Sequence, residues 1–406
     1  MEICPPMLLT FQGSPWGDLA RQFGAVIRQF WPLAAIAFGV SLVATPLLRR
    51  IALAYGVVDR PDAFLKPHGK PIPYLGGLAI FLGWLAGIAA ACIMTRIQVD
   101  TVLMLGIVAA GTIVVLVGLF DDLRVMPSTV KLGFNIIVAL GLLALGLGDN
   151  VIQVFTHVMG VRFEESGRWL ELLYSVPIVL FIVVGATNAT NLIDGLDGLC
   201  SGVLAIIAAG FFVLAAHLRV FTHADIADER IILAAAMLGG ALGFLPFNRT
   251  PAKIFMGDAG SMLLGLNAAI LILLFADERM VRWMIGALMV FGLPVGDMLL
   301  TLVRRFRNGR PLMEGDRSHF YDQLRDRGLT VRQVVAISYV LTLAFVIAGT
   351  FVIFLRTRYA VLVYFMVVML AVAAVWRFDM VSIERGPRRS AGSPGSDATP
   401  PQGDEL

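Results

Sequence analysis

Long apolar runs alternate with short polar segments along almost the whole chain. A membrane-spanning helix needs about 20 mostly apolar residues, within a range of roughly 17–25. On this criterion the pattern predicts eleven spans, at residues 31–48, 74–94, 102–120, 130–147, 172–190, 199–218, 231–247, 261–275, 283–303, 334–355 and 359–376. The eighth run is short, and we expect its helix to begin several residues earlier. The pattern predicts an all-α, polytopic integral membrane protein of about eleven transmembrane helices.

Composition supports this class and excludes others. The 406 residues are 58% hydrophobic and 15% charged, with a mean hydropathy of +0.82, whereas soluble domains carry about 25% charged residues. A net charge of +3 is too small to indicate nucleic acid as a partner. The three cysteines are odd in number and widely spaced, so they predict neither a disulfide framework nor a metal cluster.

The distribution of basic residues predicts the orientation. Roughly two thirds of the 32 Lys and Arg residues, including every lysine, fall on the side that holds the C-terminal tail, and cytoplasmic loops accumulate such residues. We therefore expect a non-cytoplasmic segment at 1–30, a transmembrane domain at 31–376 and a cytoplasmic tail at 377–406. Because the tail is rich in Pro, Gly and Ser, it is expected to be disordered.

The segment NATNLIDGLDGL, residues 188–199, is a polar island between two apolar runs. Asn188, Asn191, Asp194 and Asp197 stand at the membrane edge, where ionisable groups cost several kcal/mol and are usually functional. The alternative is a loop whose Asn, Asp and Gly residues only form turns. The charge distribution assigns this segment to the cytoplasmic side.

Two adjacent acids, Asp121 and Asp122, follow the third apolar run, and Lys131 begins the next. Neighbouring carboxylates repel unless a cation lies beside them. Mg²⁺ is commonly bound by one or two carboxylates together with substrate phosphates. A pair that only caps a helix is the alternative, although two acids exceed what capping requires.

Three further loops on the same side carry candidate residues. Lys70 lies among Pro and Gly residues, where ordinary cytoplasmic charge is an equal explanation. The segment FNRTPAKIFMGDAGS contains Asn248, Lys253 and Asp258, and a helix beginning there would offer backbone N–H groups to a phosphate. The largest loop contains Arg317 and His319, where a solvated basic loop is the alternative.

One acid lies inside a predicted span. Asp297, in GLPVGDML, could approach the site or be paired within the helix bundle.

With these motifs the chain resembles the polyprenyl-phosphate N-acetylhexosamine-1-phosphate transferases. The resemblance extends from about residue 40 to 330 and rests on four motifs in order. They are PxxGG at 73–77, the Asp121–Asp122 pair, NxxNxxDGxDGL and MGDxGS. It implies transfer of a sugar-1-phosphate from a UDP-N-acetylhexosamine to a polyprenyl phosphate with release of UMP, as the first membrane step of a cell-envelope glycan pathway.

The resemblance also implies roles for individual residues. Asp121 and Asp122 match the catalytic acid pair and Asp258 the expected metal ligand, with Mg²⁺, or Mn²⁺ in its place, held by these three acids. The segment from Asn188 to Asp197 matches the nucleotide-binding floor. Substrate contacts are expected from Lys70, Lys131, Asn188, Asn191, Asp194, Asp197, Asn248, Lys253, Arg317 and His319. The membrane is a further partner, and a homodimer is left open.

The last large loop departs from the family pattern. The N-acetylglucosamine branch carries DRxHLHHxL, whereas this chain has DRSHFYDQL, with Tyr321 and Asp322 at the positions of the paired histidines. Arg317, His319 or Arg325 are candidates for the missing donors, so the identity of the hexosamine stays open.

Two other classes compete with this interpretation. A polytopic ion- or proton-coupled transporter would place its acids near the bilayer midplane, often with inverted repeats, whereas these acids cluster at span ends. A CDP-alcohol phosphotransferase would carry its paired acids in a DGxxAR start and a GxxxDxxxD finish on one helix, which the sequence lacks.

Overall fold

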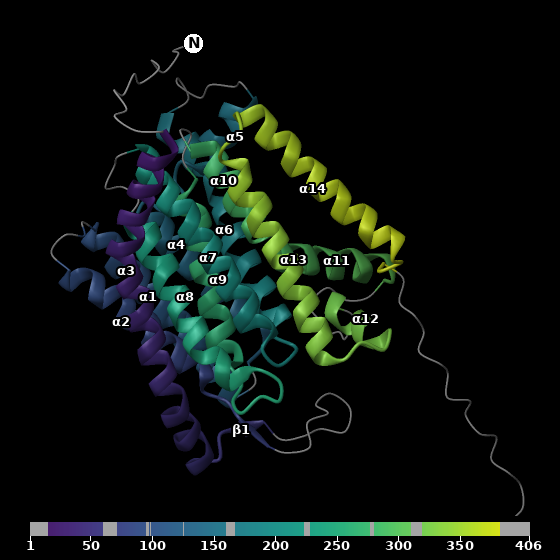
Figure 1. Ribbon diagram of the computed structural model, residues 1–406. Helices are drawn as coiled ribbons and strands as arrows, with labels where there is room; N and C mark the ends of the chain where they lie inside the picture. Colours follow the sequence, from purple (N-terminus) through teal and green to yellow (C-terminus); the bar gives the residue numbers. More distant parts are fainter. Residues whose placement is uncertain are drawn as a thin grey trace, which may run out of the picture.

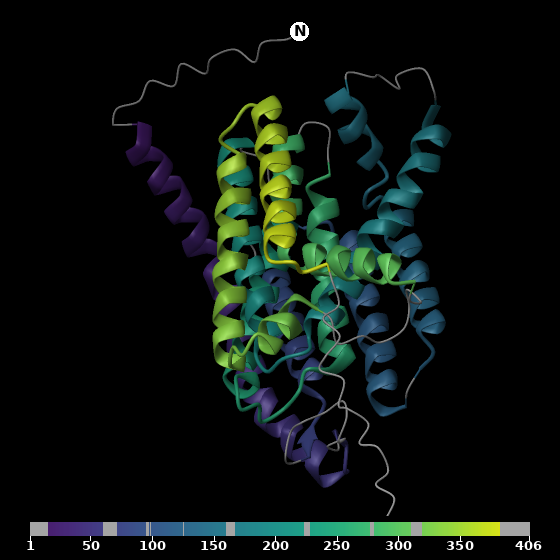
Figure 2. The same ribbon diagram turned by 90° about the vertical axis from the view of Figure 1, so that its right-hand side faces the viewer.

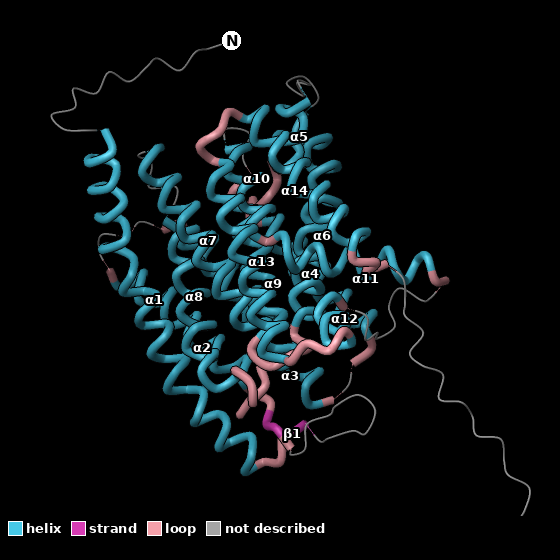
Figure 3. The backbone as a smooth tube through the Cα atoms, turned by 45° about the vertical axis from the view of Figure 1, so that its right-hand side comes forward, coloured by secondary structure: helices cyan, strands magenta, loops and turns pink. Residues whose placement is uncertain are grey.

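The computed structural model describes residues 15–59, 71–94, 97, 99–124, 126–159, 167–222, 228–276, 280–309 and 319–381. Its helices are α1 (Pro15–Ala54), α2 (Gly76–Ile93), α3 (Thr101–Leu123), α4 (Ser128–Ala144), α5 (Val151–Met159), α6 (Gly167–Ile193), α7 (Leu199–Thr222), α8 (Asp228–Asn248), α9 (Gly257–Leu274), α10 (Val281–Val290), α11 (Gly292–Arg307), α12 (Phe320–Asp326), α13 (Val331–Val352) and α14 (Thr357–Arg377). Two short strands, β1 (Val58–Asp59) and β2 (Ile72–Pro73), pair antiparallel below the bundle (Figures 1 and 3).

Apolar helices long enough to cross a membrane dominate the described chain. Nine meet that description separately, and ten do if the bent pair α10–α11 counts as one span; α4 is apolar but shorter. With α4 included, each of the eleven predicted spans corresponds to a helix or a helix pair. The predicted all-α membrane fold is therefore confirmed.

The ninth predicted span, 283–303, is not one straight helix. It breaks at Phe291 into α10 and α11, whose axes differ by 65°, and α11 lies across the direction of the other helices (Figure 1). The prediction was wrong here because the apolar run continues through the break. Beyond the break, the side chains of Asp297, Thr301 and Arg304 are buried. There they find hydrogen-bond partners that lipid would not supply.

The core lies around α7, α8 and α9, whose residues are mostly buried, whereas α14 is almost entirely exposed on the outside of the bundle. The long α1 packs against α2 and α8, and its N-terminal part diverges from the bundle (Figure 2). Forty residues of helix extend roughly 60 Å, about twice the hydrocarbon thickness. The helix thus begins at Pro15, well before the first predicted span.

The C-terminal end is ordered further than predicted. After α14, residues 378–381 turn back against α11 and α12. The Met380 carbonyl accepts hydrogen bonds from Arg304 and from Gln323. The rest of the predicted tail, 382–406, lies outside the described residues.

Candidate active site

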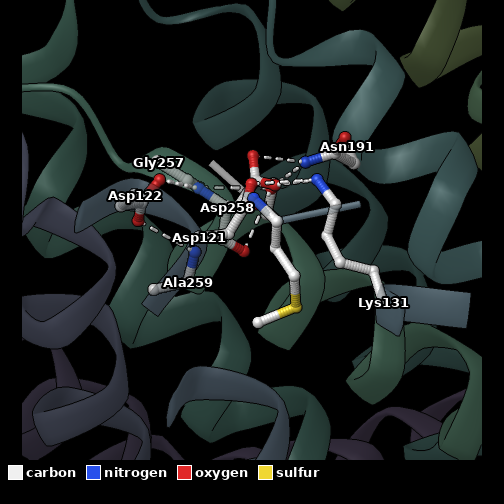
Figure 4. Close-up of polar contacts among 9 residues, drawn as sticks. Asp121, Asp122, Lys131, Asn191, Gly257, Asp258 and Ala259 are labelled. Atoms are coloured by element: carbon white, nitrogen blue, oxygen red, sulfur yellow. Dashed lines mark hydrogen bonds and ion pairs between the residues drawn. The ribbon is translucent and has the colours of Figure 1, made fainter. Parts of the chain in front are cut away.

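The ends of α3 and α6 meet the starts of α4 and α9 at one end of the bundle. Asp121 and Asp122 lie in the last turn of α3, Lys131 in the first turn of α4, and Asn191 near the end of α6. Asp258 is the second residue of α9. Figure 4 shows these side chains converging, and we call Asp121, Asp122 and Asp258 the acid cluster.

Lys131 and Asn191 hold the Asp258 carboxylate between them. Asp258 Oδ2 accepts a hydrogen bond from Lys131 Nζ at 2.9 Å, and Oδ1 accepts from Asn191 Nδ2 at 2.8 Å. The same ammonium donates to Asp121 Oδ2 at 2.9 Å. One cation therefore bridges two carboxylates and offsets their repulsion. The structure brings together Asp121, Asp258, Lys131 and Asn191, all predicted from the sequence.

Asp122 binds the start of α9 instead of Lys131. Its Oδ1 accepts from the Asp258 N–H at 2.8 Å, and its Oδ2 accepts from the Ala259 N–H at 3.3 Å. A carboxylate placed there satisfies N–H groups that a helix leaves free and complements the positive end of its dipole. The expectation that these N–H groups bind phosphate is wrong for the second and third of α9, because Asp122 occupies them.

Glycines allow this close contact between segments. Gly257 has φ +69°, and a Cβ on it would lie 2.4 Å from Asp122 Oδ2. A Cβ on Gly77 would lie 2.3 Å from the backbone nitrogen of Gly260, and one on Gly118 would lie 2.5 Å from that of Ala259. Gly77 of PxxGG and Gly118 of α3 therefore let α2 and α3 lie directly on the backbone that begins α9, and Gly257 of MGDxGS makes room for the Asp122 carboxylate.

The polar island from 188 to 199 divides into residues that face the acid cluster and residues that secure the loop. Asn191 donates to Asp258, whereas Asn188 is exposed and donates to Val184 O of its own helix. Asp197 Oδ2 accepts from the Ala252 N–H at 2.9 Å. The alternative given for this segment, a loop whose polar residues only form turns, describes Asp197 well.

Asn248 performs a similar structural task. Its buried Oδ1 accepts from the Gly198 N–H and from Ser201 Oγ, and its Nδ2 donates to the Ile254 carbonyl. The predicted contact with substrate is therefore not available to this amide without breaking these bonds.

Asp194 lies beside the acid cluster. Desolvation raises the pKa of its carboxyl well above the usual range, and the Asp258 and Asp122 carboxylates raise it further. Asp194 is thus kept close to negative charge, where a bound cation or a proton would stabilise it.

The remaining predicted residues are less involved in this cluster. The Lys253 side chain is exposed, while its carbonyl accepts from Arg49 Nε at 3.0 Å. Lys70 and Arg317 lie outside the described residues.

His319 is paired within the fold. Its Nδ1 lies 2.9 Å from Asp297 Oδ2, and Asp297 Oδ1 accepts from the Phe320 N–H at 2.8 Å. Both side chains are buried. Of the two alternatives for Asp297, the structure shows the paired one.

Comparison with known proteins identifies the family. The sequence model of glycosyl transferase family 4 matches residues 104–276, a range that contains Asp121, Lys131, Asn191 and Asp258. A probable undecaprenyl-phosphate N-acetylglucosaminyl 1-phosphate transferase of Bacillus subtilis is 33% identical over 322 residues, 77% of this chain and 83% of the relative. The chain belongs to glycosyl transferase family 4.

Other members of the family are also similar. A decaprenyl-phosphate N-acetylglucosaminephosphotransferase of Mycobacterium tuberculosis is 30% identical over 336 residues, 79% of this chain and 81% of the relative. A phospho-N-acetylmuramoyl-pentapeptide-transferase of Halalkalibacterium halodurans is 33% identical over 260 residues, 62% of this chain and 75% of the relative. The predicted resemblance to polyprenyl-phosphate hexosamine-1-phosphate transferases is confirmed, and the transporter alternative finds no support.

The carboxylate oxygens of the site suit a hard divalent cation, but they are too few to complete its coordination. Within the described ranges, no group of three or more His, Cys, Asp or Glu side chains forms a metal-binding cluster. Both oxygens of Asp122 accept from backbone N–H groups that begin α9. Asp121 and Asp258 share the Lys131 ammonium instead, whose place a metal ion could take, so they are the better candidates. Two carboxylates fit a Mg²⁺ ion that completes its coordination with phosphate oxygens and water, and do not fit an all-protein cage.

Two tyrosines that the sequence analysis did not assign to the site contact the polar island. Tyr321 donates to Leu192 O at 2.9 Å, and Tyr339 donates to Gly198 O at 2.5 Å. Tyr321 had been marked only as a departure from the family pattern. No signal in the sequence singled out Tyr339, which lies in an apolar run.

Proposed function

We propose that the protein transfers an N-acetylhexosamine-1-phosphate from a UDP-sugar to a polyprenyl phosphate, with release of UMP. The observation that carries this proposal is the bridge from Asp121 through Lys131 to Asp258, at one end of an apolar helix bundle. The family relatives named for this transfer to undecaprenyl or decaprenyl phosphate support the lipid acceptor. The UDP-sugar is the donor we infer.

The reaction brings together two anions, a lipid phosphate and a pyrophosphate. Mg²⁺, when bound by Asp121 and Asp258, would supply the positive charge that offsets their repulsion. Asn191 orients Asp258 by its amide hydrogen bond, and Asp122 fixes the start of α9 on which Asp258 stands. Lys131 lies between the two carboxylates, where it can also reach a phosphate oxygen.

A general base is not required for the acceptor. A phosphomonoester has its second pKa near 6, so the lipid phosphate is largely dianionic at neutral pH. Because Asp121 already accepts from Lys131 and from the Met126 N–H, we assign it to organising the site and not to nucleophilic attack. Incubation with a radiolabelled UDP-sugar, without lipid, tests this assignment; a trapped phospho-enzyme would contradict it.

We propose that this end of the bundle faces the cytoplasm of a bacterial inner membrane. The excess of Lys and Arg residues on that side supports the orientation, and a cytoplasmic nucleotide sugar requires it.

UMP release from purified protein tests the proposed function. The assay contains undecaprenyl phosphate, Mg²⁺ and, in turn, each member of a panel of UDP-N-acetylhexosamines. We expect release with at least one donor and none without lipid. Absence of release with every donor would reject the proposal.

One substitution tests the role of Asp258. Asp258→Asn keeps the size of the side chain and removes its charge, so we expect turnover to be abolished while membrane insertion is kept. The matched control is Asp326→Asn, at an exposed position at the end of α12. Near-normal turnover by Asp258→Asn would show that the acid cluster is not the reaction centre.

A further inference from the structure

Tyr321 joins α12 to the end of α6, beside the acid cluster. Its hydroxyl donates to the carbonyl of Leu192 at 2.9 Å. Leu192 lies in the last turn of α6, where carbonyl groups lack partners inside the helix. The Tyr321 side chain is only 4% exposed, so its ring has little freedom to move away.

The same ring covers the other side of the turn. A Cβ added to Gly195 would lie 2.2 Å from the Tyr321 hydroxyl oxygen and 2.6 Å from the ring carbon Cζ. The ring therefore occupies the space that any side chain at position 195 would need. Tyr321 thus contacts the chain on both sides of Asp194, at Leu192 and at Gly195.

Asp194 depends on this support, because its carboxyl group makes no hydrogen bond within the described part of the chain. Asp258 is held by Lys131 and Asn191, and Asp197 is held by the Ala252 N–H. No hydrogen bond to a described residue sets the direction of the Asp194 side chain, so the position of its backbone and the packing around it do. Whatever fixes the turn from 192 to 195 therefore fixes Asp194.

The Tyr321 ring is itself fixed from the opposite face. The rings of His319 and Tyr321 stack with centroids 5.3 Å apart and planes inclined by 9°. His319 in turn is bound to Asp297 of α11. A continuous series of contacts therefore runs from α11 through His319 and Tyr321 to the end of α6.

We propose that Tyr321 is a positioning residue that sets the orientation of Asp194 and, through it, the binding of the nucleotide sugar. This inference rests on the proposed function and on the place in the nucleotide-binding floor that the family resemblance implies for Asp194. It gives the departure DRSHFYDQL a physical role: the tyrosine replaces an imidazole with a longer donor that reaches the end of α6.

The test compares Tyr321→Phe with Tyr339→Phe. Both variants keep the ring and lose one hydrogen bond to the same loop, since Tyr339 donates to Gly198 O, on the far side of the loop from Asp194. For Tyr321→Phe we expect the KM for the UDP-sugar to rise about fivefold, the factor typical of one lost hydrogen bond. The KM for the lipid should stay unchanged, and the Tm should fall by no more than in Tyr339→Phe, which also loses one hydrogen bond. For Tyr339→Phe we expect no rise in the KM for the UDP-sugar.

Gly195→Ala approaches the same contact from the other side. The added methyl group displaces the Tyr321 ring, so the KM for the UDP-sugar should rise at least as much as in Tyr321→Phe. If both changes act through this contact, the KM for the UDP-sugar in the double variant rises by less than the product of the two single fold-changes. Should Gly195→Ala fail to fold, Tyr321→Phe alone decides.

Each outcome has a definite meaning. An unchanged KM in Tyr321→Phe, or equal rises in the two tyrosine variants, overturns the inference. A lower Tm together with equal changes in both KM values indicates a structural role and also overturns it. Binding of UDP-N-acetylglucosamine, measured by calorimetry on the wild type, separates the two proposals. A wild type that neither binds nor consumes any donor rejects the proposed function and the inference with it.

Discussion

Lys131 carries the charge that lets Asp121 and Asp258 lie next to each other. Lys131→Met removes both charge-assisted hydrogen bonds, so the carboxylates repel and the arrangement of the site is lost. We expect kcat to fall at least about 100-fold, from two bonds of about 1.5–3 kcal/mol each. Initial rates of UMP release measure the loss. Arg332→Met, at an exposed position on α13, controls for the loss of a positive charge, and a decrease of less than threefold in Lys131→Met would contradict the role.

Gly257 is a second position where the identity of one residue decides whether the acid cluster can form. Its φ of +69° costs about 1–2 kcal/mol for any residue with a Cβ, and that Cβ would overlap the Asp122 carboxylate. Gly257→Ala should therefore lower the free energy of unfolding by about 2 kcal/mol or more and abolish turnover. Thermal unfolding in detergent, followed by near-ultraviolet circular dichroism, measures the first effect.

Gly133→Ala is the matched control for Gly257→Ala. Gly133 lies within α4, and no described atom comes within 4 Å of where its Cβ would be. Alanine there should be neutral or stabilise by up to about 1 kcal/mol. Equal destabilisation of the two variants would show that the contact between Gly257 and Asp122 has no special importance.

At the scale of elements, the segment that follows α14 joins α11 to α12, because the Met380 carbonyl accepts hydrogen bonds from both helices. The fully buried Arg304 donates from Nε and Nη2 to Met380 O, at 3.1 and 2.6 Å. We expect Arg304→Met to lower the free energy of unfolding by about 2–3 kcal/mol, because hydrogen bonds from a charged donor are lost. Limited proteolysis should then cut after α14 sooner than in the wild type. The control is Arg307→Met, an exposed position on the same helix, and unchanged proteolysis of Arg304→Met would refute the attachment.

The sequence predicted which residues gather at the site better than what each of them does. Asp121, Lys131, Asn191 and Asp258 form hydrogen bonds with one another, as their motifs suggested. Motifs could not reveal that the oxygens of Asp122, Asp197 and Asn248 are occupied by backbone or side-chain donors. Such bonds join segments that lie about 50 to 140 residues apart in the sequence, and no periodicity encodes that.

At the scale of the whole molecule, apolar length predicted the crossings because the hydrocarbon thickness imposes a minimum run of residues. The same criterion could not detect the break at Phe291, which interrupts the helix and not the apolar run. It also cut α1 short, because the sixteen residues from Pro15 to Phe30 are too polar to count as a span but continue the helix. Length and hydropathy thus identify the crossings. The bends and the extensions of the helices depend on packing and cannot be predicted in this way.

The eleven predicted crossings have a consequence for sidedness. They place Asp326, on the side of the membrane that holds the acid cluster, and Asn150, which follows the far end of α4, on opposite faces; both positions are exposed. In a variant without its native cysteines, Asp326→Cys should react with a membrane-impermeant maleimide in inverted vesicles and resist it in right-side-out vesicles. Asn150→Cys should show the reverse. Labelling of both positions from one side would mean that α4, which is short for a span, does not cross, and the orientation inferred from the Lys and Arg residues would fail with it.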